Sequence, residues 1–135
     1  MMKMITLTIL IVLISQSVFA PAENYLYLEQ GHTINPYLPI IKAVTAVESA
    51  NGKYLLNEKE NAVGWFGIRP VRLDDYNWRT GNNITHEQCY EYEVGKMIFL
   101  YYASQIDYRD IESICISWNG VSEKNLYYKK ILKAL

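Results

Sequence analysis

Glu48 is the residue whose type and position could best support acid–base chemistry. It follows an apolar run with helical spacing and is succeeded by Ser49, with Gly52 three residues further on. A carboxyl group beside an apolar helix face loses part of its hydration, which raises its pKa and keeps its proton available near neutral pH. A general acid that cleaves a sugar–sugar bond needs this property. The alternative interpretation of this feature alone is a solvated glutamate on an ordinary amphipathic helix.

The histidines and cysteines do not form a comparable pattern. His32 and His86 are not spaced with any Cys or Asp residues in the way that metal ligands are, so we expect no metal site and no cofactor. Cys89 and Cys115 could form a disulfide in an oxidising compartment. Two buried free thiols that pack as small hydrophobic side chains are the alternative.

The element that must position Glu48 is a predicted helix over residues 37–50. Apolar residues recur there with a spacing near three, at Leu38, Ile41, Val44 and Val47. Pro39 suits its first turn, and Gly52 is a natural left-handed cap at its end. Residues 61–70 read NAVGWFGIRP, and the two glycines on either side of the aromatic pair favour a tight turn or a small β-hairpin near residues 61–68.

The remainder of the chain predicts further helices. A short helix is expected over residues 73–78, and a capping box at Thr85 and Gln88 opens a long helix that ends near Ser104. We expect that long helix to bury Tyr90, Val94, Met97, Ile98 and Tyr101. Asp110 can cap the next helix, which would bury Ile111, Ile114, Cys115 and Trp118 and stop at Asn119-Gly120. A last helix starts at Ser122 or Asn125 and carries Leu126, Tyr127, Ile131 and Leu135. The predicted class is therefore mainly α.

Length, charge and the N-terminal segment bound the kind of protein. A chain of 135 residues supports one domain, and 13 Lys and Arg against 14 Asp and Glu, without a basic stripe, argue against nucleic acid as the main partner. Lys3, an apolar run over residues 5–14 and the small residues Ala20 and Ala22 indicate a secretory signal peptide over residues 1–22. An uncleaved membrane anchor is the alternative. We expect residues 23–135 to form one exported domain, periplasmic or extracellular.

Four motifs stand in an order that points to a known family. They are Glu48-Ser49-x-x-Gly52, the segment Asn61 to Pro70, Ser117-Trp118-Asn119-Gly120, and Tyr127-Tyr128-x-x-Ile131. In this order and spacing the chain resembles the soluble-type (SLT) lytic transglycosylases of glycoside hydrolase family 23, which belong to the lysozyme-like superfamily and stand beside the goose-type lysozymes. The resemblance covers roughly residues 37–132. It implies a single lysozyme-like domain.

The resemblance also implies residue roles. Glu48 stands at the position of the catalytic glutamate, which protonates the leaving glycosidic oxygen and then acts as a base. Ser49 matches a serine that forms a hydrogen bond near the substrate, and Tyr127 matches a tyrosine near that glutamate. The loop over residues 62–68 matches one that lines the sugar groove. The substrate-binding residues expected from the loop and from the later motif are Gly64, Trp65, Phe66, Ile68, Trp118 and Asn119.

Two residues depart from the family pattern. Gly67 stands where the family loop has a Gln that contacts the substrate, and Trp118 stands where the family has a Tyr. The first change could weaken activity, alter substrate choice or mark a domain that binds glycans without cleaving them. The second keeps an aromatic plane. We expect Trp65 and Trp118 to stack on sugar rings.

The function expected from this resemblance is that of an exported peptidoglycan lytic transglycosylase, a lyase of glycosidic bonds. Its partners would be peptidoglycan glycan strands, with the protein peripheral to the cell envelope and monomeric. Cleavage would use one glutamate, assisted by the N-acetyl group of the substrate, and would form a 1,6-anhydro ring. Two alternatives stay open, namely a hydrolytic goose-type-like lysozyme and an inert glycan-binding domain. A hydrolase would need a second carboxylate, for which the candidates are Glu58, Glu60, Asp74 and Asp75.

Overall fold

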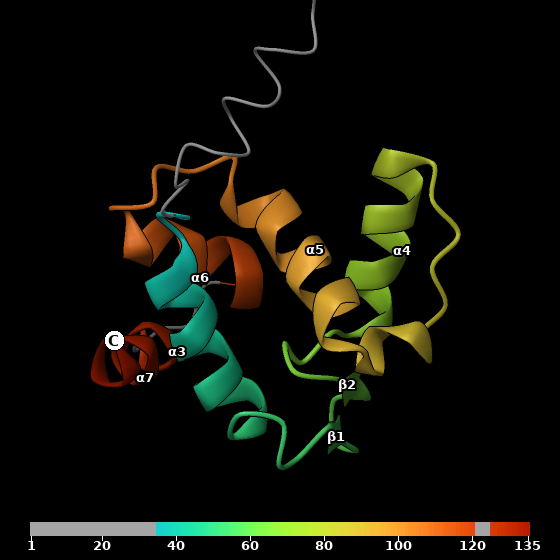
Figure 1. Ribbon diagram of the computed structural model, residues 1–135, viewed down its shortest axis with the longest axis horizontal. Helices are drawn as coiled ribbons and strands as arrows, with labels where there is room; N and C mark the ends of the chain where they lie inside the picture. The colour runs from blue at the N-terminus through green and yellow to red at the C-terminus, as the bar shows by residue number, and fades with distance from the viewer. Residues whose placement is uncertain (1–34, 121–124) are drawn as a thin grey trace, which may run out of the picture. The chain divides into compact units, whose positions relative to one another are not determined.

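The computed structural model describes residues 35–120 and 125–135 (Figure 1). The predicted signal peptide, residues 23–34 and the possible helix start at Ser122 lie outside the described residues. In the part of the chain that is described, no helix is long and apolar enough to cross a membrane.

The described fold is mainly α, as predicted, with one small antiparallel sheet. Its elements in chain order are α3 (Leu38–Ser49), β1 (Leu56–Asn57), β2 (Ala62–Val63), α4 (Pro70–Thr80), the 3₁₀ helix η1 (Gln88–Tyr90), α5 (Tyr92–Ala103), α6 (Ile111–Asn119) and α7 (Leu126–Ala134). Helix α7 packs on α3 and α6, and α5 packs on α6 (Figure 1). These packed helices hold the C-terminal end of α3, where Glu48 lies.

Helix α3 forms where the apolar spacing predicts it and has a proline in its first turn. It buries Ile40, Ile41 and Val44, whereas Leu38 stays exposed. Its end differs from the prediction, because Ala50 rather than Gly52 is the left-handed cap, with φ of 49°. The backbone stays left-handed from Ala50 through Gly52, and this turns the chain sharply away after Glu48.

The predicted hairpin lies earlier in the chain than expected. Strands β1 and β2 pair Leu56 with Val63 and Asn57 with Ala62. Val63 then forms a second, isolated bridge with Ile68, in which the two residues exchange backbone hydrogen bonds of 3.0 and 2.8 Å. Residues 63–68 therefore form the predicted tight turn, but it is anchored to a hairpin over residues 56–63.

The long helix after the capping box also differs from the prediction. The box itself forms, since the Thr85 N–H donates to Gln88 Oε1 at 2.9 Å and the Gln88 N–H donates to Thr85 Oγ1 at 3.3 Å. It opens only the short η1, and α5 begins at Tyr92. The buried face of α5 contains Ile98 as predicted, but its other members are Gly95, Phe99, Tyr102 and Ala103, while Met97 and Tyr90 are exposed.

The last two helices are close to the prediction. The Asp110 carboxylate accepts a hydrogen bond from the Ser113 N–H at 3.0 Å, and Gly120 ends α6. Ile114, Cys115 and Trp118 are buried, and Ile131 is the buried residue of α7. Leu126 and Leu135 are exposed, against expectation. Cys89 and Cys115 are both buried free thiols, so the disulfide considered above is absent.

Candidate active site

Glu48 lies in the last turn of α3 at the wall of a cleft of about 300 Å³. Burial of the carboxyl group raises its pKa from 4.5 to about 7. Smaller influences lower that pKa, namely the nearby Tyr127 hydroxyl and the positive charge of Arg69, while the charge of Glu60 raises it. Desolvation prevails, as it does for buried carboxyl groups generally. Glu48 can therefore hold a proton near neutral pH, the property that the sequence suggested for it.

The Tyr127 side chain reaches Glu48 from α7. Its hydroxyl is buried and has no hydrogen-bond partner of good geometry among the described residues. It is close enough to the Glu48 carboxylate to lower the pKa of that group, and burial raises its own pKa above the ordinary value. A buried hydroxyl without a good partner has hydrogen-bonding capacity left over. Tyr127 can use this capacity on Glu48 when that residue is ionised.

Gly67 lies directly against the Glu48 carboxyl group. A Cβ atom at position 67 would overlap Glu48 Oε2 and come within 3.0 Å of its Cδ. The backbone at Gly67 is also left-handed, with φ of 62°, which disfavours any residue with a side chain. A side chain at position 67 would therefore require the Glu48 carboxyl group, the flexible end of its side chain, to move.

Ser49 is placed differently from the expectation of a substrate contact. It is buried, with an exposed fraction of 1%. Its hydroxyl lies 3.0 Å from the carbonyl oxygens of Thr45 and Trp65 and accepts a hydrogen bond from the Gly52 N–H. All of these partners belong to the protein, so Ser49 ties the end of α3 to the 63–68 turn and does not face a ligand.

The loop residues expected to bind substrate are mostly part of the interior. Phe66 and Ile68 are fully buried in the hydrophobic core. Gly64 is also buried, and a Cβ atom at this position would collide with the carbonyl oxygen of Cys89. Trp65 is half-buried, and its ring packs edge-on against Tyr92 at a centroid distance of 5.3 Å. None of these four residues lines the cleft beside Glu48, and of the whole loop Gly67 is the residue that does.

The two residues of the later motif line the cleft in different ways. Trp118 is 8% exposed, packs edge-on against Phe99 and donates from Nε1 to the Phe66 carbonyl at 3.3 Å. Its ring is thus a buried wall of the cleft and cannot serve as an open stacking surface, contrary to expectation. Asn119 is half-buried, and its Oδ1 accepts a hydrogen bond of 2.9 Å from Arg69.

Helix α4 supplies cleft residues of which the sequence had singled out only Asp75, as a candidate second carboxylate. Val71, Arg72 and Asp75 line the same cleft as Glu48, together with Arg69 just before the helix. Nothing in their spacing separates them from ordinary surface residues, because their role depends on where α4 packs. Arg69 also forms an ion pair of 3.3 Å with Glu60, so this one side chain spans from the hairpin to Asn119 at the end of α6.

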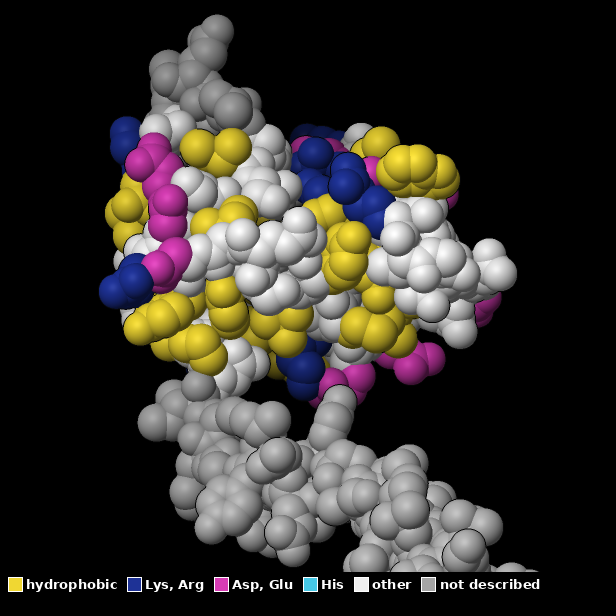
Figure 2. Space-filling model, turned by 90° about the horizontal axis from the view of Figure 1, so that it is seen from above, with side chains coloured by type: hydrophobic (Ala, Val, Ile, Leu, Met, Phe, Trp, Pro, Cys, Tyr) yellow, Lys and Arg dark blue, Asp and Glu magenta, His cyan; other side chains and the backbone are white. Residues whose placement is uncertain are grey.

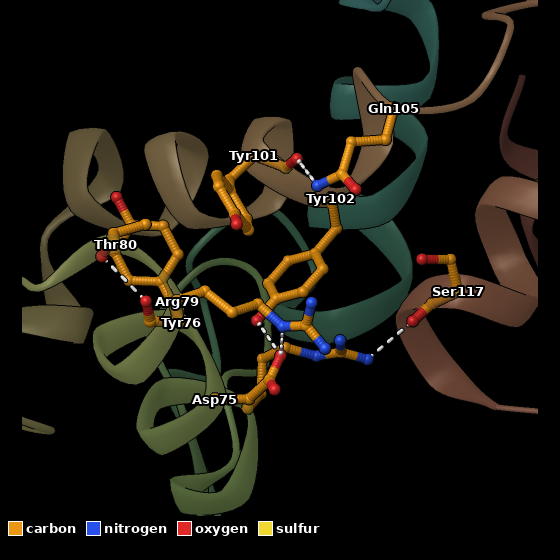
Figure 3. A network of polar contacts seen from close by, with 9 residues as sticks. Asp75, Tyr76, Arg79, Thr80, Tyr101, Tyr102, Gln105 and Ser117 are labelled. Carbon is orange, nitrogen blue, oxygen red and sulfur yellow. Dashed lines mark hydrogen bonds and ion pairs between the residues drawn. The ribbon is translucent and has the colours of Figure 1, made fainter.

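Asp75 belongs to a network that joins α4 to α5 (Figure 3). Its Oδ2 accepts hydrogen bonds from the Tyr102 hydroxyl at 2.6 Å and from Arg79 Nε at 2.8 Å. These two hydrogen bonds hold the pKa of Asp75 below its usual value, and the bond from Tyr102 contributes most. The guanidinium of Arg72 lies 4.4 Å from the centre of the Tyr102 ring and donates to the carbonyls of Ser117 and Trp118. The cleft therefore has an ionised carboxylate on the wall that α4 forms.

A second, more open depression also reaches Glu48. It is lined by Glu48 and by residues before, within and just after β1, namely Tyr54, Leu56, Asn57, Glu58 and Lys59. Glu48 is thus shared by two hollows, one bounded by α4 and α6 and the other by the hairpin.

No cluster of His, Cys, Asp and Glu residues within residues 35–120 and 125–135 could hold a metal ion. His86 Nε2 instead lies 3.1 Å from the Ile68 carbonyl oxygen, where it braces the turn.

Comparison with known proteins finds no family model, no curated protein and no solved structure that matches this chain.

Proposed function

We propose that this protein is an exported lytic transglycosylase with a lysozyme-like fold, which cleaves the β-1,4 bond between N-acetylmuramic acid and N-acetylglucosamine in peptidoglycan. One observation carries the proposal. A single glutamate with a pKa of about 7 lies at the end of a helix, where two hollows meet. This arrangement provides a protonated acid on a wall that two neighbouring hollows share, where a polymer that occupied both would present a bond to it.

In the first step Glu48 acts as a general acid. Its carboxyl proton moves to the glycosidic oxygen while the bond from that oxygen to the muramic acid C1 breaks. The N-acetyl carbonyl oxygen of the substrate supplies electrons to C1, so no protein nucleophile is needed. Burial keeps Glu48 protonated until this moment, because its charged form is poorly solvated in the cleft.

In the second step Glu48 is a carboxylate and acts as a base. It removes the proton from the C6 hydroxyl of the same sugar, and O6 attacks C1 to close the 1,6-anhydro ring. The N-acetyl oxygen leaves C1 at the same time, and Glu48 recovers its proton. Arg69 and the Tyr127 hydroxyl both favour the carboxylate form, so they can stabilise Glu48 between the two steps.

A hydrolytic lysozyme is the second candidate, and Asp75 is the observation that favours it. This aspartate lines the same cleft as Glu48 and has a lowered pKa, so it is ionised at neutral pH. In a hydrolase such a carboxylate would orient a water molecule. Against this role, Oδ2 of Asp75 is already engaged by Tyr102 and Arg79. The inert glycan-binding alternative stays open, because Gly67 lacks the polar side chain that the resemblance places at this position.

The test is to digest peptidoglycan sacculi with the purified protein and with its Glu48→Gln variant, and to weigh the released fragments by mass spectrometry. We expect fragments with 1,6-anhydro ends, lighter than hydrolytic fragments by one water, and none from the variant. Glu87→Gln, which changes an exposed glutamate away from the cleft, is the matched control and should cleave like the wild type.

The other outcomes are equally decisive. Fragments with reducing ends would assign the protein to the hydrolases and direct attention to Asp75. If neither protein released fragments while both bound sacculi, the domain would be a glycan-binding module and the proposal would be wrong.

A further inference from the structure

Trp78 is the most exposed large hydrophobic side chain among the described residues, with an exposed fraction of 81%. It lies near the C-terminal end of α4. An exposed tryptophan gives up the hydrophobic stabilisation that burial would provide. A single exposed apolar residue is unremarkable in itself, so its meaning depends on what adjoins it.

Trp78 continues a row that starts in the cleft. Val71, Asp75 and Trp78 are spaced i, i+4 and i+7, which places them on one face of α4. Val71 and Asp75 line the cleft beside Glu48, and Val71 is itself 72% exposed. At 1.5 Å per residue, Trp78 lies about 10 Å further along the helix axis than Val71. The row leads outward from the cleft along the surface of α4.

A chain of polar contacts links Trp78 to the wall of the cleft that α4 forms. The guanidinium of Arg79 lies 6.0 Å from the centre of the Trp78 ring. Arg79 in turn donates to Asp75 at 2.8 Å, and Asp75 accepts from Tyr102 of α5 at 2.6 Å (Figure 3). The surface beside the ring is thus fixed by α4 and α5 together.

The chemistry of this face suits a sugar better than a protein partner. A pyranose ring presents C–H bonds on its faces and hydroxyl groups around its edge, so it is matched by a flat aromatic ring with polar groups beside it. The Trp78 ring has polar groups beside it in this way, because Asp74, Asp75 and Arg79 lie on the same or the adjoining face of α4. The centre of a protein–protein interface is instead depleted of charged residues. Figure 2 shows hydrophobic side chains next to Lys and Arg side chains on the side of the molecule where α4 lies.

We propose that Trp78 forms a remote glycan-binding subsite, which stacks on a sugar ring of a strand whose cleavable bond lies at Glu48. The inference rests on the proposed function for its ligand class, but not on turnover. Its consequence is a preference for long strands, because a ligand that fills only the cleft does not reach Trp78.

The test compares binding of a short and a long chito-oligosaccharide, a dimer and a hexamer, by calorimetry. All proteins carry Glu48→Gln, so that no ligand is cleaved. We expect the added change Trp78→Ala to weaken hexamer binding about tenfold, which corresponds to about 1.4 kcal/mol, and to leave dimer binding unchanged. Trp78→Phe, which keeps an aromatic face, should retain most of the hexamer affinity. Leu132→Ala, at an exposed leucine of α7, is the control for loss of surface hydrophobicity.

Each other result overturns the inference in a recognisable way. If Trp78→Ala changes neither affinity, or weakens both ligands equally, Trp78 is not a remote subsite. If the protein self-associates in sedimentation and Trp78→Ala abolishes this without affecting the glycans, the face binds a second copy of the chain. If the Glu48→Gln background binds neither oligosaccharide, the proposed substrate class fails first, and the subsite fails with it.

Discussion

The backbone of Gly67 lies so close to the Glu48 carboxyl group that a side chain at position 67 would force that carboxyl group to move. A Cβ atom at position 67 would overlap Glu48 Oε2. Gly67 therefore leaves free the space that the carboxyl group of the proposed acid occupies. A substitution at position 67 can therefore displace the Glu48 carboxyl group at the end of α3.

Gly67→Ala should displace the Glu48 carboxyl group and abolish cleavage. The matched control is Gly81→Ala, since Gly81 is also left-handed, with φ of 72°, but has no atom within 4 Å of the added Cβ. Both variants should lose about 1 kcal/mol of stability from the backbone conformation alone. Gly67→Ala should lose more, together with activity. Equal activity in the two variants, measured by sacculus digestion, would show that contact with Glu48 does not matter.

The pH dependence of stability should reveal the buried carboxyl group. The pKa of Glu48 is about 7 when folded and 4.5 without that environment, so the folded state binds the proton more tightly. The stability that this proton binding contributes is fully present below 4.5, the pKa of Glu48 in the unfolded state, and is lost as pH rises through about 7. Glu48→Gln has no ionisable group at this position, so its stability does not fall in this way as pH rises. It should match the wild type near pH 4 and exceed it near pH 8 by about 1–3 kcal/mol.

Chemical unfolding of both proteins at the two pH values measures this difference. Glu87→Gln, at an exposed glutamate, should show no such trend. A constant difference between Glu48→Gln and the wild type at both pH values would mean that Glu48 is an ordinary solvated carboxylate.

Arg69 and Glu60 should shift the activity profile in opposite directions. Arg69 lowers the pKa of Glu48 by its positive charge, and Glu60 raises it. Since the first step needs protonated Glu48, activity falls as pH rises through this pKa. Arg69→Gln should move that fall to higher pH, and Glu60→Gln should move it to lower pH. Initial rates of sacculus solubilisation across pH measure both, and shifts of the same sign would contradict the assigned electrostatics.

Ser49→Ala should reduce stability without reducing affinity for glycans. The change removes the acceptor of the partly buried Gly52 N–H and the donor to the Thr45 carbonyl, at a cost of about 1 kcal/mol or more. Thermal unfolding and calorimetric titration with an oligosaccharide separate the two effects. Ser104→Ala, at an exposed position, is the control. A variant that stays fully stable but no longer binds would restore the direct substrate contact that the sequence suggested.

Asp75→Asn should leave the anhydro product unchanged if the protein is a transglycosylase. The variant weakens the contacts of position 75 with Tyr102 and Arg79, so a modest loss of stability is expected. Glu87→Gln, at an exposed acidic residue outside the cleft, is the control. Mass spectrometry of the fragments measures the outcome. Loss of all products in Asp75→Asn alone, after reducing-end products in the wild type, would identify Asp75 as the second carboxylate of a hydrolase.

The local sequence determined most of the helices and the candidate acid. Helical spacing of apolar residues located α3 and α6, and the cap at Asp110 and the stop at Gly120 are decided by side chains within a few residues. Glu48 stood out for the same reason, because its apolar neighbours are adjacent in sequence. Local signals failed on α5, where the capping box opens a 3₁₀ turn and the buried face follows Phe99 and Tyr102.

Only the tertiary structure decided which residues line the cleft. The aromatic and apolar residues of the 63–68 turn suggested a sugar-binding surface, but Phe66 and Ile68 are drawn into the core, since burying their apolar surface stabilises the fold. Arg69, Arg72 and Asp75 reach the cleft because the segment from Arg69 into α4 lines the same hollow as the ends of α3 and α6. Burial and pKa depend on contacts between segments far apart in the chain, so residue type and spacing proposed the acid, while packing set its proton affinity and its neighbours.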